Sequence, residues 1–96
     1  MAKINYVFEG TIEFYSSGWL GGGSWNNVPN NGDVSIQSGG GSISMNGAGR
    51  YIYSVSASTS DNTGIRFRYS TNRNYEQTRT ISQLKSNSNL TLTRVN

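Results

Sequence analysis

The chain has 96 residues and contains neither cysteine nor histidine. Without these residue types, disulfide bonds, thiolate nucleophiles and histidine-dependent acid–base catalysis are excluded, and transition-metal sites are disfavoured. The net charge is +3, and no apolar stretch approaches the roughly 20 residues that are needed to span a bilayer. We therefore expect a single domain, residues 1–96, that is not an enzyme and requires no metal or cofactor.

The N-terminal sequence lacks the apolar segment of a signal peptide. A secreted domain of this length would often contain disulfide bonds. These two features favour a cytoplasmic or virion-associated protein over a secreted one, and the location stays open.

The first predicted strand spans residues 4–14. Apolar side chains occupy its even positions and mostly polar side chains its odd positions. This period of two predicts one buried and one exposed face. Gly10 interrupts the apolar series, so we expect either one long bent strand with a bulge or two shorter strands.

A glycine-rich segment with two tryptophans follows, and it predicts a loop or an irregular strand. Besides core packing, loop tryptophans stack on sugar rings or lie at a membrane–water interface. We expect Trp25, which adjoins strand-like sequence, to lie in the core and Trp19 to be exposed. With a nearby tyrosine and two short polar side chains, the candidate ligand-binding residues are Trp19, Trp25, Tyr15, Asn26 and Asn27.

The remaining chain alternates between short amphipathic strands and turns. No window has a helical period followed by an apolar stripe. The pattern predicts an all-β fold, a single small antiparallel β-sandwich or flattened barrel of seven or eight short strands. The turn signals are found at residues 26–33, 39–41, 46–47, 61–64 and 86–89.

Basic residues accumulate in the second half of the chain. Arg66 and Arg68 share one face of a predicted strand, and Arg73 follows in the next loop. Basic groups among aromatic residues resemble a surface for single-stranded nucleic acid. They are also typical of the outer face of an amphipathic strand, and we expect Tyr69 in the core, because it shares a strand face with Ile65 and Phe67. Both readings of this basic face stay open.

The acidic residues do not form a catalytic pair. Glu9 and Glu13 share a strand face but are separated by roughly 13 Å at ~3.3 Å per residue, too far for a glycosidase pair on a straight strand. A weak calcium site at Asp33 or Asp61 stays open as an alternative.

Residues 22–53 resemble part of a known family. A Gly-Gly-Ser-Trp segment ending at Trp25 is followed by Pro29, by Ile36 and by the segment Gly-Ala-Gly-Arg-Tyr-Ile-Tyr at residues 47–53. This spacing is similar to that of the aegerolysins and the actinoporin-like β-sandwich proteins. The chain is shorter and more basic than typical aegerolysins and lacks the N-terminal amphipathic helix of actinoporins. The resemblance implies binding of a lipid headgroup or a glycan, without autonomous pore formation.

We therefore expect a non-enzymatic binding module that recognises a glycan or lipid headgroup through loop aromatics and Asn, Ser and Gly polar groups. Two alternatives stay open. One is a structural or assembly protein, such as a phage or capsid component, that forms a homo-oligomer. The other is a nucleic-acid-binding protein that acts through Arg66, Arg68 and Arg73.

Overall fold

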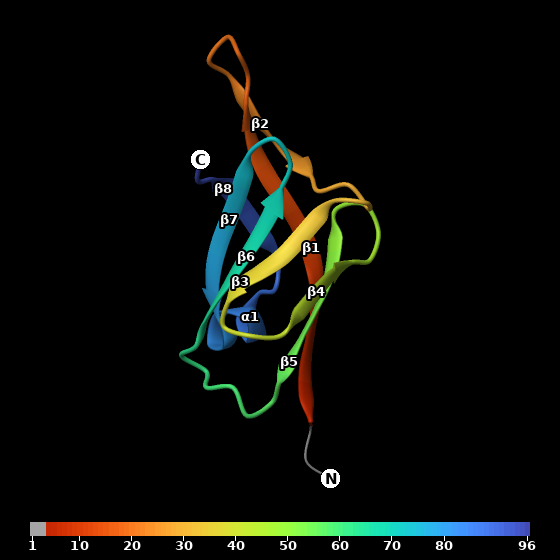
Figure 1. The fold of residues 1–96 in the computed structure, drawn as a ribbon, viewed down its shortest axis with the longest axis vertical. Coiled ribbons are helices and arrows are strands. Elements are labelled where there is room, and N and C mark those ends of the chain that lie inside the picture. The colour runs from red at the N-terminus through yellow and green to blue at the C-terminus, as the bar shows by residue number, and fades with distance from the viewer. Residues whose placement is uncertain (1–3) are drawn as a thin grey trace.

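The computed structural model describes residues 4–96 and consists mostly of strands (Figure 1). The all-β prediction is confirmed, because eight strands form one nearly closed, barrel-like sheet. The elements are β1 (Asn5–Ser17), β2 (Gly23–Asn27), β3 (Asp33–Ser38), β4 (Ser42–Met45), β5 (Arg50–Ser56), β6 (Gly64–Ser70), β7 (Asn74–Thr80), α1 (Ile81–Ser86) and β8 (Leu90–Arg94).

The strands follow the order β3-β6-β7-β8-β1-β5-β4, and β2 pairs with β1 beside this path. The two end strands, β3 and β4, contact each other, so the sheet curls into the flattened barrel that was one of the two expected shapes. All pairs are antiparallel except β1 with β8, which run parallel. This one parallel pair departs from the antiparallel arrangement expected from the sequence.

β1 is a single strand of 13 residues. Its register with β5 continues unbroken through Gly10, so the bulge considered at this position is absent. A Cβ atom on Gly10 would lie only 2.8 Å from the carbonyl oxygen of Ser88. Glycine is therefore required here because the backbone at Ser88 approaches β1 closely. Ile4, expected on the buried face, is 82% exposed because it precedes the part of β1 that borders the core.

Aromatic side chains fill much of the core. Tyr51, Tyr53 and Phe67 are fully buried, and the Phe67 ring lies 6.0 Å and 5.1 Å from the two tyrosine rings. Phe14 of β1 packs against Tyr69 at 5.0 Å between ring centroids. The expected core position of Tyr69 is confirmed, since only 8% of it is exposed.

The short helix α1 was not expected from the sequence. The Thr80 hydroxyl accepts a hydrogen bond from the Gln83 backbone, and the Gln83 side chain accepts one from the Thr80 backbone, which is a capping box. Six residues are too few to show a helical period, so only this pair marked the helix start. Among the described residues, no helix has the length and apolar character that crossing a membrane requires.

The molecule is elongated, with principal extents of 54 × 25 × 21 Å, because one hairpin leaves the barrel (Figure 1). In this hairpin, β1 and β2 pair from Glu13 opposite Asn27 to Ser17 opposite Gly23. We call residues 13–27 the projecting hairpin, residues 18–22 its tip, and the remaining structure the barrel body.

Candidate functional site

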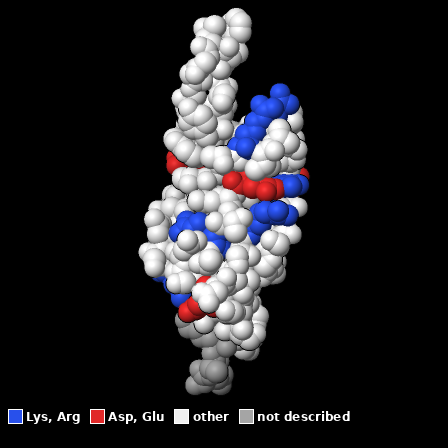
Figure 2. Space-filling view, turned by 90° about the vertical axis from the view of Figure 1, so that its left-hand side faces the viewer, with Lys and Arg blue, Asp and Glu red and all other residues white. Residues whose placement is uncertain are grey.

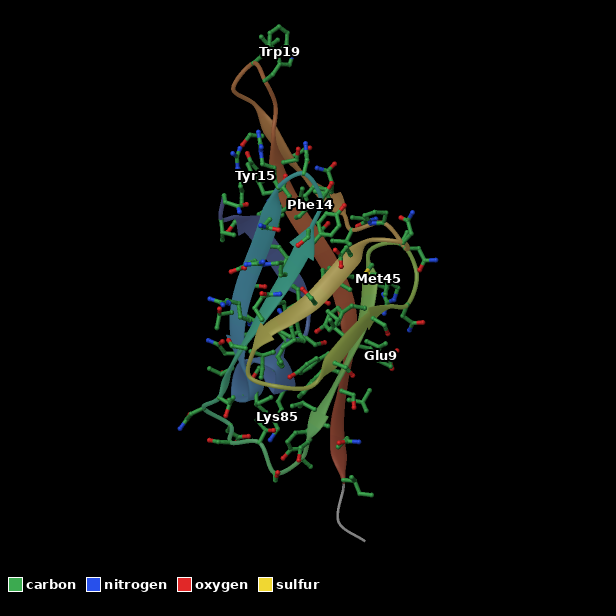
Figure 3. All side chains as sticks on the ribbon, in the orientation of Figure 1. Glu9, Phe14, Tyr15, Trp19, Met45 and Lys85 are labelled. Carbon is green, nitrogen blue, oxygen red and sulfur yellow. The ribbon has the colours of Figure 1, made fainter. Side chains whose placement is uncertain are left out.

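The tip of the projecting hairpin presents two large apolar side chains to solvent. Trp19 is 93% exposed and Leu20 is 82% exposed. Figure 3 shows Trp19 at the far end of the molecule, pointing away from every other element. Backbone hydrogen bonds between Gly18 and Gly22 and between Gly21 and Gly18 close the turn beneath them. The tip is therefore an ordered turn whose two apolar side chains take no part in packing the fold.

The projecting hairpin is uncharged above its base. Residues 14–32 contain no Asp, Glu, Lys or Arg. In Figure 2 the extension at the top is entirely white, whereas patches of basic and acidic side chains lie on the body below and beside its base. An uncharged segment can enter a medium of low dielectric constant without the cost of desolvating a charge.

Tyr15 and Trp25 form an aromatic pair across the hairpin, below the tip. They are directly opposite in the β1–β2 register, and their rings meet edge to face at 5.1 Å. A Cβ atom on Gly23 would overlap the Tyr15 ring, so the glycine lets Tyr15 lie across β2. The expectation that Trp25 belongs to the core is wrong, because 46% of it is exposed and the hairpin has no second layer to cover this face.

The two predicted asparagines support the hairpin. The Asn26 side chain donates a hydrogen bond of 3.1 Å to the carbonyl oxygen of Ser24. The Asn27 side chain lies against Gly49, where an added Cβ atom would overlap it. The structure therefore brings all five predicted ligand-binding residues onto one hairpin, with Asn26 bonded within the hairpin and Asn27 packed against the barrel body.

A pocket of about 290 Å³ lies at the base of the projecting hairpin. Its walls come from the end of β1, the turn between β6 and β7, the start of β7 and the end of β8. We call it the arginine pocket, because two guanidinium groups and no carboxylate line it. The lining residues are Tyr15, Ser16, Ser17, Asn72, Arg73, Tyr75 and Arg94.

The two arginines of this pocket retain donor groups. Arg73 is exposed on the β6–β7 turn and forms no ion pair with any residue in the range 4–96. The Nε atom of Arg94 donates a hydrogen bond of 2.6 Å to the main-chain oxygen of Asn96. Arg73 was a predicted site residue, whereas Arg94 was missed, because its position depends on the pairing of β8 with β7 and β1.

The other two predicted arginines lie elsewhere and are paired. Arg68 donates from Nε to Oε2 of Glu76 at 2.6 Å, and Nε of Arg66 lies 3.8 Å from Oε1 of the same carboxylate. Only 11% of the Glu76 side chain is exposed. The carboxylate thus offsets one of the two positive charges of this pair. Of the predicted basic face, Arg73 alone lines the arginine pocket.

The acidic residues do not gather into a metal site in the part of the chain that the structure describes. Glu9 accepts a hydrogen bond of 3.2 Å from the Asn46 side chain. Asp61, one of the two residues considered for calcium, forms an ion pair of 2.8 Å with Lys85.

Comparison of the chain with protein-family models, with curated proteins and with solved structures finds no significant match. The chemistry of the projecting hairpin and the arginine pocket therefore carries the functional conclusion.

Proposed function

We propose that this protein is a non-enzymatic module that binds the surface of a lipid bilayer through the tip of its projecting hairpin. The observation that carries this proposal is the exposure of Trp19 and Leu20 at the end of an uncharged hairpin. An indole ring suits the membrane–water interface, because its body is apolar and its N–H can remain hydrogen-bonded.

The size of the tip sets the expected affinity. A tryptophan buries 150–250 Å², which corresponds to about 4–6 kcal/mol at ~25 cal/mol per Å², and a leucine adds about 1.5–3 kcal/mol. Part of this gain is lost in orienting the protein on the surface. Binding through the tip is therefore reversible, with a dissociation constant on the order of micromolar to millimolar.

The edge of β2 limits how deeply the hairpin can insert. Within the part of the chain that the structure describes, β2 pairs only with β1, so its other edge carries unpaired backbone groups. Such groups cannot enter the hydrocarbon region, where no water is present to hydrogen-bond them. The tip is accordingly suited to the interface and not to a position that spans the bilayer.

Tryptophan fluorescence with phosphatidylcholine vesicles tests the proposal. In a Trp25→Phe variant the remaining indole is Trp19, and we expect its emission to shift to the blue and to be quenched by brominated lipid. In the same background, Leu20→Asp should abolish binding. Val7→Asp is the matched control, because Val7 is 57% exposed on the barrel body and its replacement changes the net charge equally.

Four outcomes would contradict the proposal. The first is an unchanged emission on adding vesicles, and the second is an equal loss of binding in the Leu20 and Val7 variants. The third is binding to immobilised glycans without binding to vesicles, which would assign the exposed Tyr15–Trp25 pair to sugar stacking. Light scattering completes the test, because a dimer that shields Trp19 would assign the tip to assembly.

A further inference from the structure

The arginine pocket lies at a defined height below the hairpin tip. Trp19 is four residues beyond Tyr15, so the pocket wall is up to roughly 13 Å from the tip at ~3.3 Å per residue. Amphipathic elements insert by roughly 5–10 Å into the boundary between headgroups and acyl chains. The headgroup layer of each leaflet is roughly 5–8 Å thick. Insertion of the tip therefore brings the arginine pocket to the level of the headgroups.

The side chains of the pocket suit a phosphate group. Arg73 and Arg94 supply guanidinium donors, whose fork geometry matches phosphate oxygens, and Ser16, Ser17 and Asn72 add neutral donors. Apart from the bond to Asn96, no hydrogen bond to a described residue engages either guanidinium.

The pocket also differs from the rest of the basic surface. The guanidinium groups of Arg66 and Arg68 share the carboxylate of Glu76, so part of their positive charge is already offset. No acidic side chain lines the arginine pocket. An anion in the pocket would therefore be attracted by Arg73 and Arg94 without repulsion from a neighbouring acidic side chain.

We infer, on the basis of the proposed function, that the arginine pocket binds the phosphate group of a lipid headgroup while the tip occupies the interface. Stable attachment to a membrane generally takes two signals, and the tip supplies only the apolar one. The pocket supplies an electrostatic contact, which lies at a different depth in the membrane interface from the apolar contact of the tip. Together the two contacts fix the orientation of the barrel body above the membrane.

Vesicle binding by matched charge variants tests this inference. We expect the protein to bind phosphatidylcholine vesicles that contain phosphatidic acid more tightly than vesicles of phosphatidylcholine alone. Arg73→Gln should weaken binding to the anionic vesicles by about fivefold, as expected for one basic residue near the surface. Arg66→Gln removes the same charge outside the pocket and should change binding less than about twofold.

A titration with inorganic phosphate, followed by amide NMR spectra, examines the pocket without a membrane. We expect shifts at Ser16, Ser17 and Arg73 that disappear in the Arg73→Gln variant. Equal weakening of vesicle binding in the Arg73 and Arg66 variants would overturn the inference and leave the tip proposal standing. Phosphate binding without any vesicle binding by the wild-type protein would overturn both, and would assign the pocket to a free phosphate compound.

Discussion

Aromatic residues have different roles in the barrel body and in the projecting hairpin. In the body, Tyr51, Tyr53 and Phe67 are completely buried, whereas Trp19 of the hairpin is 93% exposed. Both regions are built from β-strands, and glycine-rich turns occur in both. They differ in that the sheet of the body curls until its walls face each other, while the hairpin has two strands and no opposite wall. Closure of the sheet, and not the residue type, decides whether an aromatic side chain stabilises the fold or remains available for binding.

The strongest test of this comparison removes an aromatic ring from the body. Phe67→Ala should lower the free energy of unfolding by about 3–5 kcal/mol, because it leaves a cavity among buried rings. Urea denaturation followed by circular dichroism measures the loss. A decrease below about 1 kcal/mol would mean that the body is loosely packed and that the contrast with the hairpin is unfounded.

Alkaline pH tests the same core with a smaller expected effect. Burial raises the pKa of Tyr51 and of Tyr53 to about 12, from an ordinary value of 10.0. The folded state therefore holds these protons more tightly than the unfolded state, and stability should be complete below pH 10 and fall as the pH rises toward 12. Each pKa unit of difference between the folded and the unfolded state corresponds to at most about 1.4 kcal/mol of lost stability.

Urea midpoints across this pH range measure the effect, with Tyr53→Phe as the comparison. This variant removes one titrating group together with its hydrogen bond to the carbonyl oxygen of Gly40. It should lose less stability between neutral and alkaline pH than the wild type does. An identical loss would show that Tyr53 contributes nothing to the alkaline sensitivity.

The helix α1 allows a stability test at the end of the barrel body that lies opposite the projecting hairpin. Figure 1 shows α1 far from the hairpin, and it buries Ile81 and Leu84. Thr80→Ala removes the N-cap and should cost about 1 kcal/mol of unfolding free energy. Thr78→Ala, at an exposed position of the same strand, is the control and should cost less than about 0.5 kcal/mol. Equal costs would show that the cap contributes nothing specific.

The smallest effect on stability is expected at the tip. Replacing both Trp19 and Leu20 with serine should change the unfolding free energy by less than about 0.5 kcal/mol, because neither side chain packs against the fold. The same double variant should lose binding to vesicles. Substantial unfolding of this variant in urea at concentrations where the wild type stays folded would show that the tip belongs to the structural core.

The sequence was most informative where a local pattern determines the structure. The alternation in β1 correctly predicts that Ile12 and Phe14 face the core, because side chains on a strand alternate between its two faces. The glycine-rich segment predicts a loop or an irregular strand, and the structure has a turn at residues 18–22 with Trp19 exposed, followed by the regular strand β2. Both features depend on residues that are close together in the chain.

Features that depend on distant segments could not be predicted. The parallel pairing of β1 with β8 joins the two ends of the chain and has no local signal, and with it Arg94 of the arginine pocket was missed. Trp25 was misplaced for a related reason. Its sequence surroundings indicate a strand, but only the tertiary structure reveals that no opposite wall covers its side of that strand.

β1 runs without interruption from the barrel body into the projecting hairpin. In the body, residues 5–11 of β1 pair with β5 in an antiparallel ladder, whose hydrogen bonds are perpendicular to the strands. A force that pulls on the tip along β1 therefore shears all of these bonds together and does not open them one after another. If the tip is bound to a membrane while flow or a tethered neighbour pulls on the rest of the molecule, we expect the contact between tip and membrane to break before the barrel unfolds.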